Sequence, residues 1–252
     1  MLISLCIIAK NEEKFLEKCL DSVKETVDEI IIVDTGSTDK TKEIAGKFNA
    51  KTYDFEWCDD FSKARNFSLQ KATKDWILIL DADETIAKKD LGKIKKLIQD
   101  KDILGYKFIT RNYTNNASIS EFIPADKSYE ESEKYAGWFP SLKIRLFQNK
   151  KSINFEGIVH ELVEPSIEKL NGKVKIVDIP IHHFGDSDQS AYKRKREFYL
   201  SLCEEKVKQS PQDIDALFGL GLVYKELEKY EDAINTFKNL VKINDRFAPA
   251  YL

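Results

Sequence analysis

The sequence has few cysteines and no long apolar run. Its four cysteines, Cys6, Cys19, Cys58 and Cys203, lie far apart and form no CxxC pair, so neither a zinc site nor a disulfide framework is expected. No apolar segment approaches the roughly 18 to 20 residues that a membrane helix needs, and the first ten residues lack the basic region and cleavage site of a signal peptide. We therefore predict a cytoplasmic chain without a transmembrane segment, and peripheral membrane contact stays open.

A strong excess of either charge is also absent. The 40 Lys and Arg residues stand against 43 Asp and Glu residues, which gives a formal net charge of -3. This balance provides no electrostatic footprint for nucleic acid, so a nucleic-acid partner is not expected. With 252 residues, the chain can bury one large core or two modest ones.

Short β-branched runs alternate with amphipathic stretches in the first third of the chain. Strands are predicted at 2–8, 29–33, 51–54 and 76–80, with helices between them. Strands that are apolar on both faces and alternate with helices form a parallel sheet that is covered on both sides. The following region predicts a helix at 91–98, strands at 106–111, 142–147 and 174–181, and a long loop or lid at 112–137. A mixed sheet is expected there.

From about residue 190 only helical spacing remains. A helix is predicted at 191–209, and the stretch 215–251 resembles the tetratricopeptide pattern through Leu220, Gly221, Tyr224, Ala233, Phe237 and Pro249. The predicted fold class is α/β, a mostly parallel Rossmann-like sheet in a domain at 1–188, followed by an all-α tetratricopeptide-like region at 189–252. Because about three repeats normally stack, we expect the array to continue or to lean on the first domain, and self-association through the repeats stays open.

Three polar clusters follow predicted strands: "AKNEE", "DTGSTD" and "DADE". Ligands of parallel sheets bind outside the carboxyl ends of the strands, so these clusters are expected to converge. Asp81 and Asp83, at positions i and i+2, can face one object together, and hard oxygen ligands suit Mg²⁺ or Mn²⁺ on a diphosphate. The bland alternative is a strand end that caps a helix.

The stretch "DADET" also fits the DxDx[TV] signature of haloacid-dehalogenase-like phosphatases. In that reading Asp81 is a nucleophile and Asp83 an acid/base. The motif usually follows the first strand of that family's core, whereas three βα units precede it here. The order along the chain therefore favours the metal site.

Four motifs together carry a family resemblance: "SLCIIAKNEEKFLEKCLDSV", "EIIIVDTGSTDKT", "DDFSKARN" and "WILILDADE". In this order and spacing they resemble the family 2 glycosyltransferases of the GT-A fold, in the subgroup with C-terminal tetratricopeptide repeats. The resemblance implies an inverting enzyme that moves a sugar from a nucleotide-diphosphate donor, usually a uridine one. Because repeat arrays commonly form concave surfaces for peptides, a protein or peptide acceptor is expected, and a cell-surface glycan is the alternative.

The resemblance also implies site residues. It assigns the nucleotide-sugar site to Lys10, Asn11, Glu12, Asp34, Asp60, Arg65 and Asp81. Asp34 would bind the base or ribose, and Asp81 would lie near the ribose and the metal. Asp83 would be the principal ligand of Mn²⁺ or Mg²⁺, which neutralises charge on the leaving diphosphate. For Arg65, a contact to phosphate and a structural salt bridge to the acidic cluster are both open.

Inversion by direct displacement requires a general base for the acceptor. The candidates in and before "FEGIVHE" are Glu156, His160 and Glu161. Because related folds place an acid in this part of the chain, Glu161 is favoured. A solvated loop residue is the alternative reading of Glu161.

Two further pairs of residues have predicted roles. Related GT-A enzymes often bring a late histidine to the metal, which singles out His182 or His183 as a ligand. A satisfied structural histidine is the alternative for each. Trp138 and Phe139, beside the predicted loop, are candidates for the acceptor site because aromatic faces stack on sugars.

Two competing functions come from other classes. One is a catalytically inactive sugar-nucleotide fold that displays its repeats to a partner, although a scaffold has no need of the acidic cluster. The other is a nucleotidyltransferase, but those enzymes use a glycine-rich loop after the first strand, and "AKNEEKF" contains no glycine.

Overall fold

The computed structural model describes residues 1–119, 121–185 and 189–245. The chain divides into two compact units, each with its own hydrophobic core. The first contains residues 1–57, 64–155 and 163–187, and the second contains 58–63, 156–162 and 188–252. The predicted boundary after residue 188 lies outside the described residues. Two short segments within the predicted first domain belong to the second unit.

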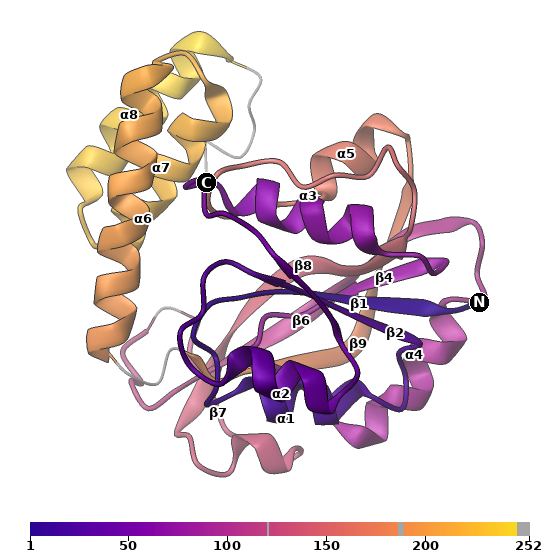
Figure 1. The fold of residues 1–252 in the computed structure, drawn as a ribbon. Helices are drawn as coiled ribbons and strands as arrows, with labels where there is room; N and C mark the ends of the chain where they lie inside the picture. The colour runs from indigo at the N-terminus through magenta and orange to yellow at the C-terminus, as the bar shows by residue number, and fades with distance from the viewer. Residues whose placement is uncertain (120, 186–188, 246–252) are drawn as a thin grey trace. The chain divides into compact units, whose positions relative to one another are not determined.

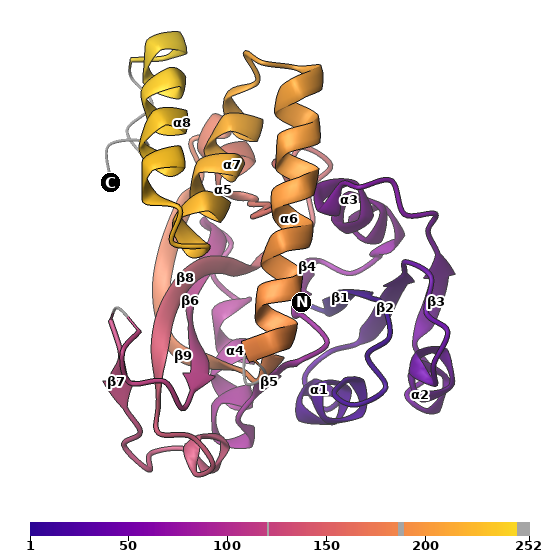
Figure 2. The ribbon, with the colours of Figure 1, turned by 90° about the vertical axis from the view of Figure 1, so that its left-hand side faces the viewer.

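The strands of the described residues form one nine-stranded sheet (Figures 1 and 2). Their order is β3-β2-β1-β4-β8-β6-β9-β5, and β7 pairs with β8. The strands are β1 (Ile3–Ala9), β2 (Glu29–Asp34), β3 (Lys51–Asp54), β4 (Trp76–Ile79), β5 (Glu84–Ile86), β6 (Ile103–Thr114), β7 (Ile123–Pro124), β8 (Gly137–Gln148) and β9 (Lys173–His183). The pairs among β1 to β4 are parallel, and β8 runs antiparallel to both β4 and β6. The predicted mixed α/β architecture is confirmed.

Helices cover both faces of this sheet (Figure 1). On one face lie α1 (Leu16–Val23), α2 (Thr41–Lys47) and α4 (Leu91–Leu97), and on the other lie α3 (Phe61–Lys71) and α5 (Glu164–Lys169). Two single turns of 3₁₀ helix are η1 (Lys88–Asp90) and η2 (Glu130–Ser132). The buried residues of α1 are Leu16, Cys19, Leu20 and Val23. This spacing places one apolar stripe against the strands.

Several elements differ from the sequence prediction, since β8 begins at Gly137 and β7 and α5 were not predicted. Strand β6 extends to Thr114, so Asn112 belongs to the sheet, where it pairs with Phe139 of β8, and not to the predicted loop. The end of β6 lies beside a polar site and carries polar residues on one face. These residues interrupt the apolar periodicity from which strands were predicted. The short strand β5, directly after "DAD", was not predicted, because three residues are too few to carry a period.

The second unit contains three helices of the described residues, α6 (Gln189–Gln209), α7 (Ile214–Glu226) and α8 (Tyr230–Ile243). Gly221 permits the close approach of α7 and α8, since a Cβ there would overlap the ring of Phe237. The segment 156–162 forms a small hairpin that places Val159 in the core of this unit. The helical spacing is confirmed, the tetratricopeptide identity stays a prediction, and Pro249 lies outside the described residues.

A buried carboxylate ties the amino ends of the strands together. The Glu29 side chain, 3% exposed, accepts hydrogen bonds from Ser4 Oγ at 2.6 Å, Lys51 Nζ at 2.7 Å and the Thr73 backbone N–H at 2.8 Å. Burial raises the pKa of Glu29, but these hydrogen bonds outweigh burial and lower the pKa from 4.5 to about 2. The ionised form of Glu29 is therefore more stable in the folded state than in the unfolded state, and it contributes to the stability of the fold.

Glu29→Gln should destabilise the fold by about 2 kcal/mol near neutral pH. Because the folded pKa is depressed, this contribution is fully present above pH 4.5 and is lost as the pH falls toward 2. Urea denaturation of both proteins at several pH values would measure the change, with the exposed Glu168→Gln as the matched control. A difference in unfolding free energy that stays constant from neutral to acidic pH would contradict this account.

Candidate active site

A tight turn joins β4 to β5 and carries the acidic cluster. The Glu84 backbone N–H donates to the Asp81 carbonyl at 3.0 Å, and the Asp81 backbone N–H donates to Glu84 Oε2 at 2.8 Å. Glu84 is 1% exposed and is therefore committed to closing this turn. The turn leaves Asp81 and Asp83 on the carboxyl side of the sheet.

Two buried arginines compensate the charge of the turn. Arg65, from α3, donates to Asp81 Oδ1. Arg145, from β8, donates from Nη2 to Glu84 Oε1 at 2.6 Å, and its Nη1 lies 3.8 Å from Asp81 Oδ2. Both arginines are 6% exposed and Glu84 is 1% exposed, so the ion pair of Arg145 with Glu84 lies where the effective dielectric constant is low.

The two carboxylates respond differently to this environment. Burial raises the pKa of Asp81, but the guanidinium groups of Arg65 and Arg145 outweigh burial and hold the pKa well below its usual range. Burial also raises the pKa of Glu84, and there Arg145 opposes the change only in part. Asp81 is therefore ionised, and the guanidinium groups of the two arginines balance its negative charge. This favours the salt-bridge reading of Arg65.

Asp83 faces His183 across the end of β9. Asp83 Oδ2 lies 3.2 Å from His183 Nε2, and both side chains are largely buried, at 14% and 12% exposed. The Phe184 backbone N–H donates to the Asp83 carbonyl at 3.1 Å, which fastens the end of β9 to the turn. A Cβ on Gly185 would overlap Asp83 Oδ2 and lie 3.0 Å from His183 Nε2, so only glycine permits Asp83 to pack this closely against the backbone.

The neighbouring His182 lies on the other face of β9. It is fully buried, with Nδ1 2.6 Å from the Tyr113 hydroxyl and its ring stacked on that tyrosine. Burial lowers the pKa of His182 to about 3, so the ring is neutral. Adjacent residues of a strand point to opposite faces, which separates His182 from the pair formed by Asp83 and His183.

The ends of β1 and β2 form one connected polar loop system. Asn11, in the left-handed region at φ 57°, accepts from the Thr38 backbone N–H at 2.8 Å through Oδ1. The Glu12 backbone N–H donates to Thr41 Oγ1 at 2.7 Å. Asp34, 1% exposed, accepts from the backbone N–H groups of Gly36 and Ser37 at 2.9 and 2.7 Å. Lys10 is exposed beside them.

Two predicted site residues belong to the second unit. Asp60 accepts from Ser62 Oγ at 2.6 Å and from the Lys63 backbone N–H at 3.1 Å, so it caps the start of α3. Glu161 lies in the hairpin 156–162 and is partly exposed. The proposed roles of Asp60 and Glu161 stay predictions.

The predicted acceptor aromatics point to different faces of β8. Trp138 is 8% exposed and belongs to an aromatic cluster with Tyr113 and Phe184. Arg111 Cζ lies 4.6 Å from the Trp138 ring centroid, which covers the indole with a cation. Phe139 is half-buried, and its carbonyl accepts from Asn112 Nδ2 at 3.0 Å.

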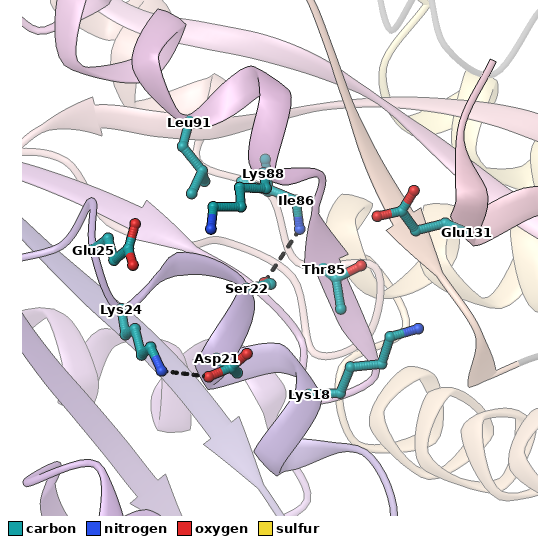
Figure 3. A pocket seen from close by; sticks show the side chains of 10 residues that line it. All are labelled: Lys18, Asp21, Ser22, Lys24, Glu25, Thr85, Ile86, Lys88, Leu91 and Glu131. Atoms are coloured by element: carbon teal, nitrogen blue, oxygen red, sulfur yellow. Dashed lines mark hydrogen bonds and ion pairs between the residues drawn. The ribbon is translucent and has the colours of Figure 1, made fainter.

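A pocket of about 320 Å³ lies among α1, β5 and the start of α4 (Figure 3). Its lining residues are Lys18, Asp21, Ser22, Lys24, Glu25, Thr85, Ile86, Lys88, Leu91 and Glu131. Three lysines and three acidic residues balance each other, and none of the predicted donor or metal residues is among them. A diphosphate requires net positive charge or a cation, so this pocket is not the candidate donor site.

The sequence analysis missed three residues of the site. Arg145 stands inside the apolar run "LKIRLF", and a charge within a buried strand signals a buried ionic partner. Asn112 was placed in a loop. Gly185 follows "HHF" without any pattern of its own, so only the coordinates reveal why it is glycine.

The comparisons with known proteins point to one family. The family model described as Glycosyl transferase family 2 matches residues 4–152. The SPbeta prophage-derived glycosyltransferase SunS of Bacillus subtilis is 32% identical over 250 residues, which cover 95% of this chain and 54% of that protein. A TPR repeat-containing protein of Synechococcus elongatus is 35% identical over 190 residues, which cover 73% of this chain and 42% of that protein. The chain thus spans about half the length of these relatives.

Solved structures share the fold at low identity. Staphylococcus aureus TarS 1–349 in complex with UDP has a TM-score of 0.55 at 16% identity, covering 97% of this chain and 81% of that one. Glucosyl-3-phosphoglycerate synthase from Mycobacterium tuberculosis, in complex with Mn²⁺, UDP and phosphoglyceric acid, has a TM-score of 0.52 at 15% identity, covering 81% and 78%. The predicted GT-A fold class is confirmed.

Arg145→Met should lower the unfolding free energy by about 3 kcal/mol, because it leaves Glu84 buried without its cation. Adding Glu84→Gln should recover part of that loss, since the uncompensated charge is then removed. Urea denaturation of wild type, both single variants and the double variant would measure the coupling. Strictly additive effects would show that the pair is not coupled.

Proposed function

Because the chain belongs to glycosyl transferase family 2, we propose that it transfers a sugar from a nucleotide-diphosphate donor, with inversion at the anomeric carbon. The observation that carries the proposal is the pairing of Asp83 Oδ2 with His183 Nε2, 3.2 Å apart, beside the arginine-bound Asp81. A uridine donor is supported by TarS and by the mycobacterial synthase, both of which were crystallised with UDP. The phosphatase alternative loses its support, since the family match includes "DADE".

The residues present fit a divalent cation. A carboxylate oxygen and an imidazole nitrogen converge, and glycine at position 185 permits the close approach of Asp83 to the backbone there. Such donors suit Mn²⁺ or Mg²⁺. Among the described residues no group of three or more His, Cys, Asp or Glu side chains forms a metal cluster. When bound, the cation would supply charge stabilisation for the leaving diphosphate.

The chain's own side chains perform the remaining tasks in this proposal. Asp83 and His183 would hold the cation, and Asp81, fixed by its two arginines, would stand beside the ribose. Asp34, oriented by the N–H groups of its own loop, would accept a hydrogen bond from the base or ribose. Because these groups are anchored before the donor arrives, little reorganisation is needed at the moment of transfer.

The acceptor in this proposal is a protein, a peptide or a cell-surface glycan. Glu161 would take the proton from the attacking group of the acceptor. The helical unit would contribute to acceptor recognition, since stacked helical pairs form extended binding surfaces. None of the described helices is long and apolar enough to cross a membrane.

Asp83→Ala should weaken Mn²⁺-dependent UDP binding by at least about tenfold, because one of the two protein ligands is lost. Isothermal calorimetry with UDP, with and without Mn²⁺, would measure the effect. Asp100→Asn removes a carboxylate whose partner is the exposed Lys175 and should bind like wild type. Equal UDP affinity with and without Mn²⁺ in wild type would contradict metal dependence, and an absence of UDP binding would favour the inactive scaffold.

Glu161→Gln should leave donor binding intact and reduce metal-dependent donor hydrolysis by about 10²-fold or more, because no group then takes the proton from the nucleophile. The matched comparison is Glu156→Gln, which removes the neighbouring candidate acid. Hydrolysis of UDP-sugars, followed by release of UDP, requires no knowledge of the acceptor. Wild-type turnover by the Glu161 variant would exclude Glu161 as the base.

A further inference from the structure

Asn112 occupies a position in which its amide orientation is determined by its neighbours. Its Nδ2 donates to the Phe139 carbonyl at 3.0 Å and to Ser141 Oγ at 3.2 Å. A carbonyl oxygen can only accept, so the atom that faces it must be the NH₂ group. Asn112 Oδ1 therefore points the other way, toward His183, and it can only accept a hydrogen bond there.

This orientation provides an acceptor for a proton on His183 Nδ1. Asn112 Oδ1 lies 3.0 Å from His183 Nδ1, so the amide oxygen accepts a hydrogen bond in the tautomer that carries its proton on Nδ1. In a neutral imidazole the lone pair is then on Nε2. Nε2 is the atom that lies 3.2 Å from Asp83 Oδ2. In the tautomer with the proton on Nδ1, the two potential ligands present lone pairs to the same space, whereas in the other tautomer Nε2 donates to Asp83.

The sheet itself positions these groups. Across four neighbouring strands the register pairs Phe139 of β8 with Asn112 of β6, Asn112 with His183 of β9, and His183 with Glu84 of β5. Directly opposite residues of paired strands have their side chains on the same face. Asn112 is 8% exposed, so little water competes with His183 for its amide oxygen.

We infer that Asn112 is a positioning residue, which holds the proton of His183 on Nδ1 and thereby keeps Nε2 available to a divalent cation. The inference rests on the proposed function, because it gives this pair of ligands a metal to bind. Without Asn112, a proton on Nδ1 loses the acceptor that the amide oxygen provides. In the tautomer with the proton on Nε2, this nitrogen donates a hydrogen bond to Asp83 Oδ2. Neither atom is then available to bind a cation.

The test combines the position of the proton with the affinity for Mn²⁺. Long-range ¹H–¹⁵N spectra of the imidazole rings report which nitrogen is protonated, and the three histidines of the chain can be assigned with His183→Ala. In wild type at mildly alkaline pH, His183 should carry its proton on Nδ1. In Asn112→Leu the proton should move to Nε2. A purely structural role for Asn112 would not produce this shift.

The same variants give a second readout without catalysis. Mn²⁺ is titrated into a mixture of protein and UDP, and electron paramagnetic resonance measures the free Mn²⁺. The Asn112→Leu variant should bind Mn²⁺ about 10- to 100-fold more weakly than wild type. Thr110→Val is the matched control, since it removes a buried hydroxyl without a hydrogen-bond partner two residues earlier in β6. Its Mn²⁺ affinity should equal that of wild type.

The outcomes separate this inference from the proposed function. A wild-type His183 with its proton on Nε2 overturns the inference even if the Asn112 variant fails to fold. Wild-type Mn²⁺ affinity in Asn112→Leu, together with loss in Asp83→Ala, overturns the role of Asn112 and leaves metal dependence standing. If wild type binds UDP without any need for Mn²⁺, metal dependence fails, and the proton position in the metal-free protein still decides what Asn112 does.

Discussion

The burial of Glu84 beside Asp81 at the end of β4 is the constraint on which the rest of the structure depends. Glu84 could not remain buried in this turn without a compensating cation, because an isolated charge is costly to bury, and Asp81 adds a second negative charge beside it. Arg65 supplies one cation from α3 and Arg145 supplies the other from β8. The turn is thereby joined to a helix on one face of the sheet and to the first antiparallel strand. Asp83, between the two compensated residues, is directed toward β9 and His183.

Both halves of the sheet contribute residues to the candidate site, the parallel half through its loops and the antiparallel half through His183. Strands β1 to β4 bring their polar loops to one edge, which is the usual ligand edge of such sheets. His183 reaches Asp83 across 100 positions of sequence, because β9 pairs with both β6 and β5. A row of directly opposed residues then connects β8 to the acidic turn. This row gives the middle of the sheet a chemical role in addition to its packing role.

The sequence predicted the parts of the site that lie in local motifs. "DADE", "DTGSTD" and "AKNEE" each follow a strand whose apolar period is clear, so Asp34, Asp81 and Asp83 could be identified before any coordinates. When two adjacent residues of a strand are of the same type, a local sequence pattern does not show which of them faces the site. The choice between His182 and His183 therefore required the register of β9 with β5 and β6.

By itself, the sequence determined the α/β class, the carboxyl-edge clusters and the helical end of the chain, because hydrophobic periodicity and strand-end motifs are local properties. Only the tertiary structure decided that Glu84 closes a turn, that Arg145 compensates it, and that Asn112 orients His183. The tertiary structure also shows why residue 185 is glycine, since a Cβ there would overlap Asp83. These facts depend on strand register and on distances between segments far apart in the chain, and no local pattern encodes either of them.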